Sequence, residues 1–157
     1  MYLGLDPGRD KVGFAFVNEE GVLLCSGIFQ AESFEAFLSA LIGENWDYIG
    51  SYKLEGSISA LFGQKLEVVL LGGGTTFKDF EQVLQRNGIR YEIVDESFTT
   101  LRARKAYFQI HPPKGLRRCI PSSLLIPKRD VDDLAAWELV KKWLQNKDIH
   151  GGVSYGF

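Results

Sequence analysis

Three parts of this chain place carboxylates at the ends of apolar segments, and these carboxylates are the side chains best suited to chemistry. Asp6 ends one apolar run, and Asp95 and Glu96 end another. Asp132 and Asp133 begin an amphipathic segment closer to the C-terminus. Carboxylates beside apolar segments are costly unless a positive charge compensates them, so the pattern predicts a site for a divalent cation.

The cation predicted for this site is one that prefers oxygen ligands. The chain has two histidines and two cysteines. Cys25 and Cys119 are far apart and show neither zinc-site nor redox spacing, so we expect two reduced thiols. A ligand set made of oxygen atoms favours Mg²⁺ or Mn²⁺ over Zn²⁺.

The spacing of the last predicted helix decides how Asp132 is interpreted. Helical periodicity places Asp132 on the same face as Ala136 and Val140, on or beside the buried side of the helix. The alternative role, that of an exposed aspartate which caps a helix at its positive end, fits Asp130 better than Asp132. Asp132 is therefore interpreted as a metal ligand.

Two other carboxylate positions stay open at this point. Asp133 is a further metal ligand, a helix cap or an exposed side chain. Only one of Asp95 and Glu96 can face a given side if the strand continues through both residues. Periodicity alone does not choose between these two.

A segment without acidic residues separates the second and third carboxylate groups. Residues 97–129 contain no Asp or Glu but eight basic residues, Arg102, Arg104, Lys105, Lys114, Arg117, Arg118, Lys128 and Arg129. A nuclease requires this combination, with cations to hold a polyanion and carboxylates to hold a metal. The alternative is a solvated face that balances acidic helices elsewhere. The glycine-rich residues 72–76 either direct backbone amides at a phosphate or form a tight turn.

The elements that must position these residues form an α/β fold with a mixed five-stranded sheet flanked by helices. Apolar and alternating runs predict an antiparallel three-stranded meander followed by two parallel strands, at residues 2–5, 12–17, 22–29, 66–71 and 89–94. Apolar periodicity predicts helices that begin near residues 33, 77, 99 and 131. Residues 44–65 give no clear pattern, and residues 111–129 form a long connection of the kind that often carries function.

Length and composition bound the remaining possibilities. We expect one domain over residues 1–150 and a flexible tail over residues 151–157. No apolar run approaches the roughly 20 residues that cross a bilayer, and the first residues do not resemble a signal peptide, so we expect a cytoplasmic protein without a membrane partner. The sequence leaves open whether it is a monomer or a homodimer.

Three blocks of this sequence resemble the signature blocks of the YqgF/RuvC-type Holliday junction resolvase-like nucleases. The blocks are residues 3–8 (LGLDPG) with 12–15 (VGFA), then 94–100 (VDESFTT), then 131–136 (VDDLAA). The resemblance covers most of the chain, and it implies a ribonuclease H-like fold and two Mg²⁺ or Mn²⁺ ions. It also implies that Asp6, Glu96 and Asp132 are the catalytic metal ligands, which chooses Glu96 over Asp95. The sequence departs from the family at Ser97, where the family commonly has arginine, at residues 72–76 and in the long connection.

The function expected from this resemblance is metal-dependent hydrolysis of phosphodiester bonds in branched DNA or structured RNA. The residues expected to contact the nucleic acid are Arg9, Lys11, Thr75, Thr99, Thr100, Arg102, Arg117, Arg118, Lys128 and Arg129. One alternative is a nucleic-acid-binding module that keeps the fold without turnover. Another is a small ATP-dependent phosphotransferase of the actin-like or sugar-kinase class, which the length of one domain disfavours.

Overall fold

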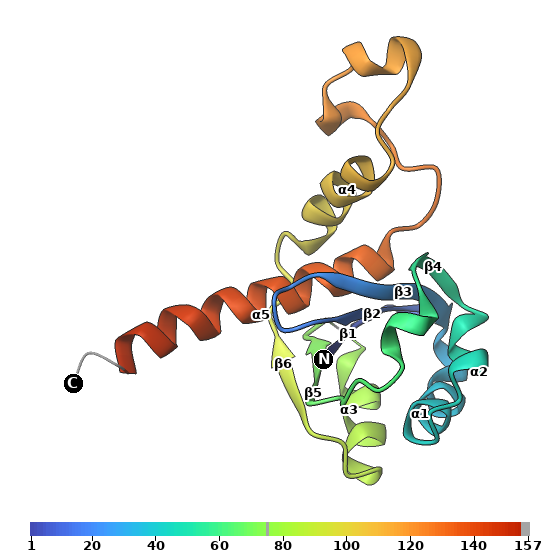
Figure 1. The fold of residues 1–157 in the computed structure, drawn as a ribbon, viewed down its shortest axis with the longest axis vertical. Coiled ribbons are helices and arrows are strands. Elements are labelled where there is room, and N and C mark those ends of the chain that lie inside the picture. Colours follow the sequence, from blue (N-terminus) through green and yellow to red (C-terminus); the bar gives the residue numbers. More distant parts are fainter. Residues whose placement is uncertain (75, 155–157) are drawn as a thin grey trace.

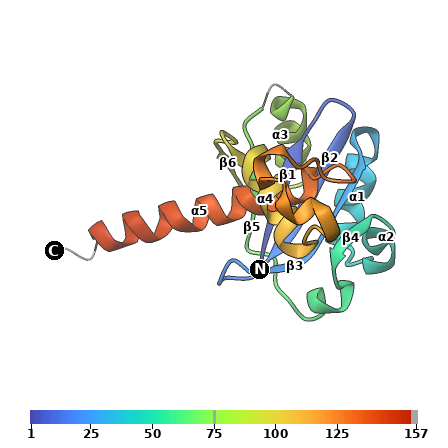
Figure 2. The same cartoon turned by 90° about the horizontal axis from the view of Figure 1, so that it is seen from above.

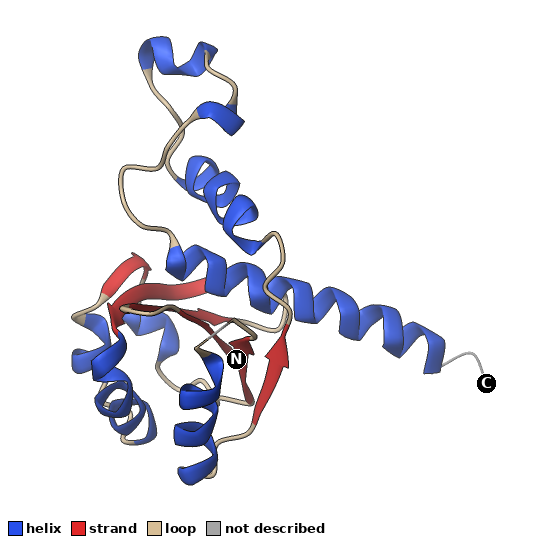
Figure 3. Cartoon of the chain, turned by 180° about the vertical axis from the view of Figure 1, so that it is seen from behind, coloured by secondary structure: helices blue, strands red, loops and turns tan. Residues whose placement is uncertain are grey.

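The computed structural model describes residues 1–74 and 76–154, and it has one mixed sheet with helices on both faces (Figure 1; Figure 3). The six strands lie in the order β4-β3-β2-β1-β5-β6. Their bounds are β1 Tyr2–Pro7, β2 Lys11–Val17, β3 Leu23–Gln30, β4 Lys53–Gly56, β5 Val68–Gly72 and β6 Tyr91–Val94. Strands β1 to β4 pair antiparallel, whereas β5 and β6 run parallel to β1.

The predicted combination of an antiparallel meander, parallel strands and flanking helices is confirmed, but the predicted number of strands is wrong. The additional strand is β4, which lies in the part of the sequence that gave no clear pattern. Most of its side chains are exposed, so it shows no run of buried apolar residues. It is a strand because it pairs with β3 at the edge of the sheet, where Cys25 lies opposite Gly56.

One face of the sheet is covered by helices α1 (Phe34–Ile42) and α3 (Phe77–Arg86), with the short helix α2 (Trp46–Gly50) beside them. The core on this face is rich in phenylalanine. Phe29 of β3 stacks on Phe37 of α1 with the ring centroids 4.4 Å apart. Alternation along the strands sends every second side chain to this core, as Leu3 and Leu5 of β1 show.

The long helix α5 (Asp132–Ser154) crosses the other face of the sheet and extends beyond it (Figure 2). Two glycines allow this helix to approach the strands closely. A Cβ at Gly4 would lie 2.3 Å from the carbonyl oxygen of Ala136, and a Cβ at Gly13 would lie 2.0 Å from that of Asp132. The backbone of α5 therefore rests directly on β1 and β2, which fixes the position of its first residue.

Residues 99–131 form a projection that we call the basic lobe, seen in yellow and orange at the top of Figure 1. It contains helix α4 (Thr99–Ile110) and the 3₁₀ turns Gly115–Cys119 and Ser122–Leu124. Helix α4 packs on α5 through small side chains, with Ala103 and Ala106 against Leu134 and Ala135. The remainder of the lobe projects away from the sheet.

The C-terminal residues that were predicted to form a tail begin as helix. Helix α5 continues to Ser154, so residues 151–154 are its last turn. Residues 155–157 of the predicted tail lie outside the described residues. Within the described part of the chain, none of the helices combines the length and the apolar character needed to cross a membrane.

Candidate functional site

Asp6 lies at the carboxyl end of the central strand β1, on the face that α5 covers. Side chains alternate along a strand, so Tyr2, Gly4 and Asp6 share one face. Tyr2 packs against Trp143 of α5, which identifies the face. Across the antiparallel pair, Asp6 lies opposite Gly13. The carboxylate therefore lies at the edge of the sheet beside the start of α5.

Glu96 reaches the same edge from the loop after β6. Its carboxylate packs against the glycine-rich turn that follows β5. A Cβ at Gly74 would lie 2.5 Å from its Oε1 atom, and a Cβ at Gly72 would lie 2.9 Å from its Oε2 atom. Because Leu5 pairs with Leu71, Gly72 lies level with Asp6. These glycines make room for Glu96, a role that neither interpretation of the turn had included.

Asp95 faces another way, although it is adjacent to Glu96. Its Oδ1 atom accepts hydrogen bonds from the backbone nitrogen and the hydroxyl of Ser97, at 3.1 and 2.8 Å. Lys142 of α5 donates to the Asp95 carbonyl at 3.0 Å and to its Oδ2 atom at 3.2 Å. The hydrogen bonds from Ser97, with that from Lys142, lower the pKa of Asp95. Lys142 thus anchors the loop that carries Glu96, a role the sequence did not reveal.

Asp132 begins α5 beside Gly13, and so lies next to Asp6 across the β1–β2 pair. Burial raises the pKa of its carboxyl group, and the charges of Asp130 and Asp133 add to the increase. Asp132, Asp6 and Glu96 therefore lie beside β2, β1 and β5 in turn, and these strands are neighbours in the sheet. We call these three residues the acidic row.

The acidic row carries negative charge that the protein leaves largely uncompensated. Burial first, and then the charges of Glu96 and Asp132, together raise the pKa of Asp6 to about 7. Glu96 is also within hydrogen-bonding reach of Asp6. Among the residues that the structure describes, no three His, Cys, Asp or Glu side chains are arranged to hold one ion.

Asp133 does not join the acidic row, in contrast to its prediction as a further metal ligand. Its side chain is fully buried. Its Oδ2 atom accepts a hydrogen bond from the Ser26 hydroxyl at 2.7 Å, and its Oδ1 atom accepts one from Arg129 at 2.8 Å. Both oxygens are therefore used within the fold. Asp133 fixes the start of α5 to β3, which is a structural role.

Arg129 also has a structural role, although the sequence predicted that it contacts nucleic acid. Besides Asp133, its guanidinium group binds Glu55 of β4 at 2.9 Å and lies 5.6 Å from the ring centroid of Tyr107. His111 approaches the same Glu55 oxygen at 2.6 Å. Burial alone would raise the pKa of Glu55, but hydrogen bonds from His111 and Arg129 outweigh it and lower the pKa. This network fixes the basic lobe to the edge of the sheet.

Thr99, Lys11 and Arg9 were also predicted to contact nucleic acid, and the structure places them in three different surroundings. Thr99 is buried, and its hydroxyl donates a hydrogen bond to the Glu96 carbonyl at 2.7 Å, so it supports the loop rather than facing solvent. Lys11 forms an exposed ion pair with Asp130. Arg9 lines a separate cavity between α1 and α3. Thr75 lies outside the described residues.

The remaining predicted contacts are exposed on the basic lobe: Thr100, Arg102, Arg117, Arg118 and Lys128. A groove of about 640 Å³ joins part of this surface to the acidic row. Thr100, Arg104 and Lys128 line it, and so do the carboxylate residues Asp130 and Asp132 near the start of α5. A polyanion lying in this groove would therefore meet both cations and the edge of the acidic row.

Comparison with known proteins adds no assignment to this geometry. A scan against models of protein families finds no match, and no curated protein matches the sequence. The function must therefore be argued from the acidic row, the groove and the basic lobe.

Proposed function

We propose that this protein is a metal-dependent endonuclease with a ribonuclease H-like fold that hydrolyses phosphodiester bonds in structured nucleic acid. The observation that supports the proposal most strongly is the acidic row beside a groove lined by cations. Asp6 has a pKa raised to about 7 by burial and by the charges of Glu96 and Asp132. Such mutual repulsion is relieved when a divalent cation binds between carboxylates.

The donor atoms of the acidic row fit Mg²⁺ or Mn²⁺. Asp6, Glu96 and Asp132 would hold the metal through carboxylate oxygens, which are the ligands these ions prefer. A bound Mg²⁺ ion supplies a Lewis acid that neutralises charge on the phosphate and lowers the pKa of water. The chain itself does the rest: Arg104 and Lys128 hold phosphates in the groove, and Lys142 and Thr99 keep the loop of Glu96 in place.

The order of the three sequence blocks also supports the proposal. The first block ends β1 at Asp6, the second follows β6 at Glu96 and the third begins α5 at Asp132. This order matches that of the YqgF/RuvC-type nucleases, in which the corresponding residues are acidic metal ligands. The substrate class we propose is branched DNA or structured RNA, which follows from the resemblance of the three blocks to these nucleases.

One observation favours a second candidate, a nucleic-acid-binding module of the same fold without turnover. In the described residues, the three carboxylates do not form a group ready to hold one ion. A module of this kind would keep the basic lobe and would bind its nucleic acid with or without Mg²⁺. The two candidates therefore differ in metal-dependent cleavage and share salt-dependent binding.

A cleavage assay separates these candidates. The wild-type chain, Asp6→Asn and the control Asp148→Asn, which changes an exposed carboxylate on the distal part of α5, would be incubated with four-way-junction DNA, duplex DNA and hairpin RNA. We expect Mg²⁺-dependent products from the wild type and the control, and none from Asp6→Asn, which should still bind. Equal cleavage by Asp6→Asn would contradict the proposal. If all three proteins bind these nucleic acids and none of them cleaves, the result would support the second candidate.

A further inference from the structure

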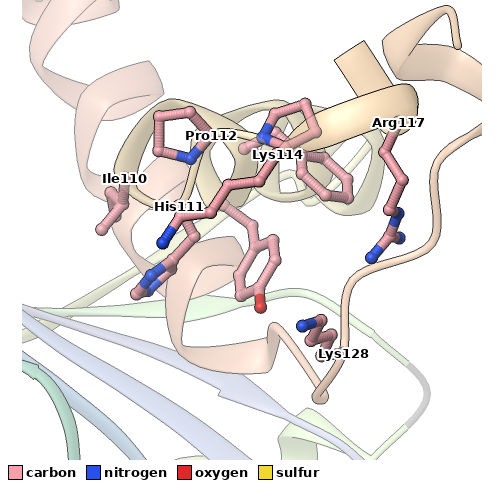
Figure 4. A pocket seen from close by; sticks show the side chains of 9 residues that line it. Ile110, His111, Pro112, Lys114, Arg117 and Lys128 are labelled. Carbon is pink, nitrogen blue, oxygen red and sulfur yellow. The ribbon is translucent and has the colours of Figure 1, made fainter. Parts of the chain in front are cut away.

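A second cavity, of about 570 Å³, lies farther out on the basic lobe, where α4 ends and the chain turns at the two prolines (Figure 4). Its basic lining residues come from three places along the chain. His111 and Lys114 follow α4, Arg117 lies in the first 3₁₀ turn, and Lys128 belongs to the returning segment. Figure 4 shows Lys114, Arg117 and Lys128 bordering the cavity from different sides.

Three cations that line this cavity lack ionic partners, whereas His111 is bound to Glu55. None of Lys114, Arg117 and Lys128 forms an ion pair within the described part of the chain. Residues 97–129 contain no Asp or Glu, so no carboxylate of this segment can supply a counter-charge. Three cations without ion-pair partners around one cavity favour an anionic ligand with several acceptor oxygens, of which phosphate is the usual one.

Apolar residues form another part of the cavity wall. Phe108, Ile110 and the two consecutive prolines line it, together with the largely buried Tyr107. The prolines make this wall rigid because their φ angles are fixed. An inorganic anion alone would gain nothing from such a wall. A nucleotide would use both parts of the wall, with its phosphate on the cations and its base against the aromatic and proline surfaces.

The cavity lies beside the groove that borders Asp132. Lys128 lines both spaces, and Arg104 and Asp132 lie farther along the groove. A single strand that enters the groove can therefore continue past Lys128 into the cavity. A free nucleotide would fill the cavity but would leave the groove unused.

We propose that the cavity bordered by Lys114, Arg117 and Lys128 binds one unpaired nucleotide of the same strand that lies in the groove. This inference rests on the proposed nucleic-acid substrate. It adds that recognition includes an unpaired nucleotide several positions away from the acidic row, because bases inside a duplex cannot reach an apolar wall. Branched DNA and hairpin RNA both contain unpaired or easily exposed nucleotides.

The first test measures binding by fluorescence anisotropy in the Asp6→Asn background, so that cleavage does not interfere. The double variant Lys114→Gln/Arg117→Gln would be compared with Lys65→Gln/Lys78→Gln, which removes two exposed cations elsewhere. For a hairpin with a single-stranded extension we expect about a tenfold loss of affinity for the cavity variant and a smaller salt dependence. The control should bind like the parent, and equal losses in both variants would overturn the proposal.

The second test locates the unpaired nucleotide. A strand carrying one photoreactive thiopyrimidine in the extension should crosslink to residues 107–117, and an abasic position there should weaken binding. Crosslinks elsewhere would overturn the proposal. So would mononucleotides that bind the cavity without competing with the strand. These binding measurements do not require turnover, so a chain that never cleaves but crosslinks at the cavity would refute the nuclease proposal alone.

Discussion

The acidic row and the basic lobe differ in how the fold holds their charged side chains. The acidic row is fixed by backbone packing, because Gly4 and Gly13 let α5 rest on the strands and Gly72 receives Glu96. The basic lobe projects from the sheet and leaves apolar side chains in solvent, with Leu116 at 90% and Ile126 at 73% exposure. The packing of the backbone thus determines where the three carboxylates of the acidic row lie. Cations for a flexible polyanion need no such restraint.

The largest effect on cleavage should be seen when the adjacent carboxylates Asp95 and Glu96 are substituted one at a time. Glu96→Gln removes a carboxylate of the acidic row, so we expect metal-dependent cleavage to fall by about 10³-fold. Asp95→Asn changes a side chain that faces Ser97 and Lys142, and its rate should stay within a few-fold of wild type. Single-turnover rates measure both. Equal losses would show that the loop as a whole matters and not the direction of Glu96.

The packing of α5 can be tested at Gly13. Gly13→Ala would place a Cβ 2.0 Å from the Asp132 carbonyl oxygen, where only movement of the backbone can relieve the contact. We expect a loss of about 3 kcal/mol in the free energy of unfolding, at the upper end for overpacked sites. Urea unfolding measures it, with Gly43→Ala as the control because the nearest atom would be 3.3 Å away. A mild effect at Gly13 would mean that α5 is less firmly seated than the acidic row requires.

The two neighbours of Asp132 test how the lobe is attached. Asp133→Asn removes one of the two carboxylates that pair with Arg129, which should cost about 2 kcal/mol because the partly buried guanidinium then keeps only Glu55. Asp130→Asn breaks only the exposed pair with Lys11 and should cost less than about 0.5 kcal/mol. Thermal unfolding of both variants gives the difference. Similar costs would contradict the structural role of Asp133.

The pKa of Asp6 predicts how stability depends on pH. Its pKa is about 7 in the fold and near 3.8 in the unfolded chain, so the folded state binds more protons between these values. Stability should therefore fall as pH rises from about 4 to about 7, by roughly 2 kcal/mol for this half-buried group. Asp6→Asn should lose this dependence and should be the more stable protein at pH 8 without metal. Parallel pH profiles for both proteins would refute the assigned pKa.

The smallest expected effect concerns the strain beside the acidic row. Phe98 has a φ of +67° and is 73% exposed, so it adopts a left-handed conformation without packing that compensates for it. Phe98→Asn should stabilise the fold by about 0.5 to 1 kcal/mol, because asparagine tolerates this region. Phe62 is 59% exposed with a φ of −63°, so Phe62→Asn serves as the control and should bring no gain. Chemical unfolding at fixed pH compares the two.

Local patterns in the sequence predicted those features whose causes are local. The helical spacing after Asp132 predicted that this residue lies on or beside the buried side of its helix, and it begins α5 beside Gly13 of β2. The role of Asp133 could not be predicted from local patterns, because its partner Ser26 lies 107 residues away in the sequence. Strand β4 was missed because its side chains are mostly exposed and only the pairing with β3 defines it. The space that Gly72 and Gly74 leave for Glu96 depends on tertiary structure alone.

The salt bridge between Arg129 and Glu55 connects the edge strand β4 to the basic lobe. Glu55 lies in β4, at the edge of the sheet opposite to β6, yet it holds both Arg129 and His111 of the projecting segment. A substitution of Glu55 would remove these contacts and so change how the basic lobe is held, without changing a carboxylate of the acidic row. Related chains could thus diverge in the shapes of nucleic acid they accept by altering one anchoring glutamate while the reaction itself stays the same.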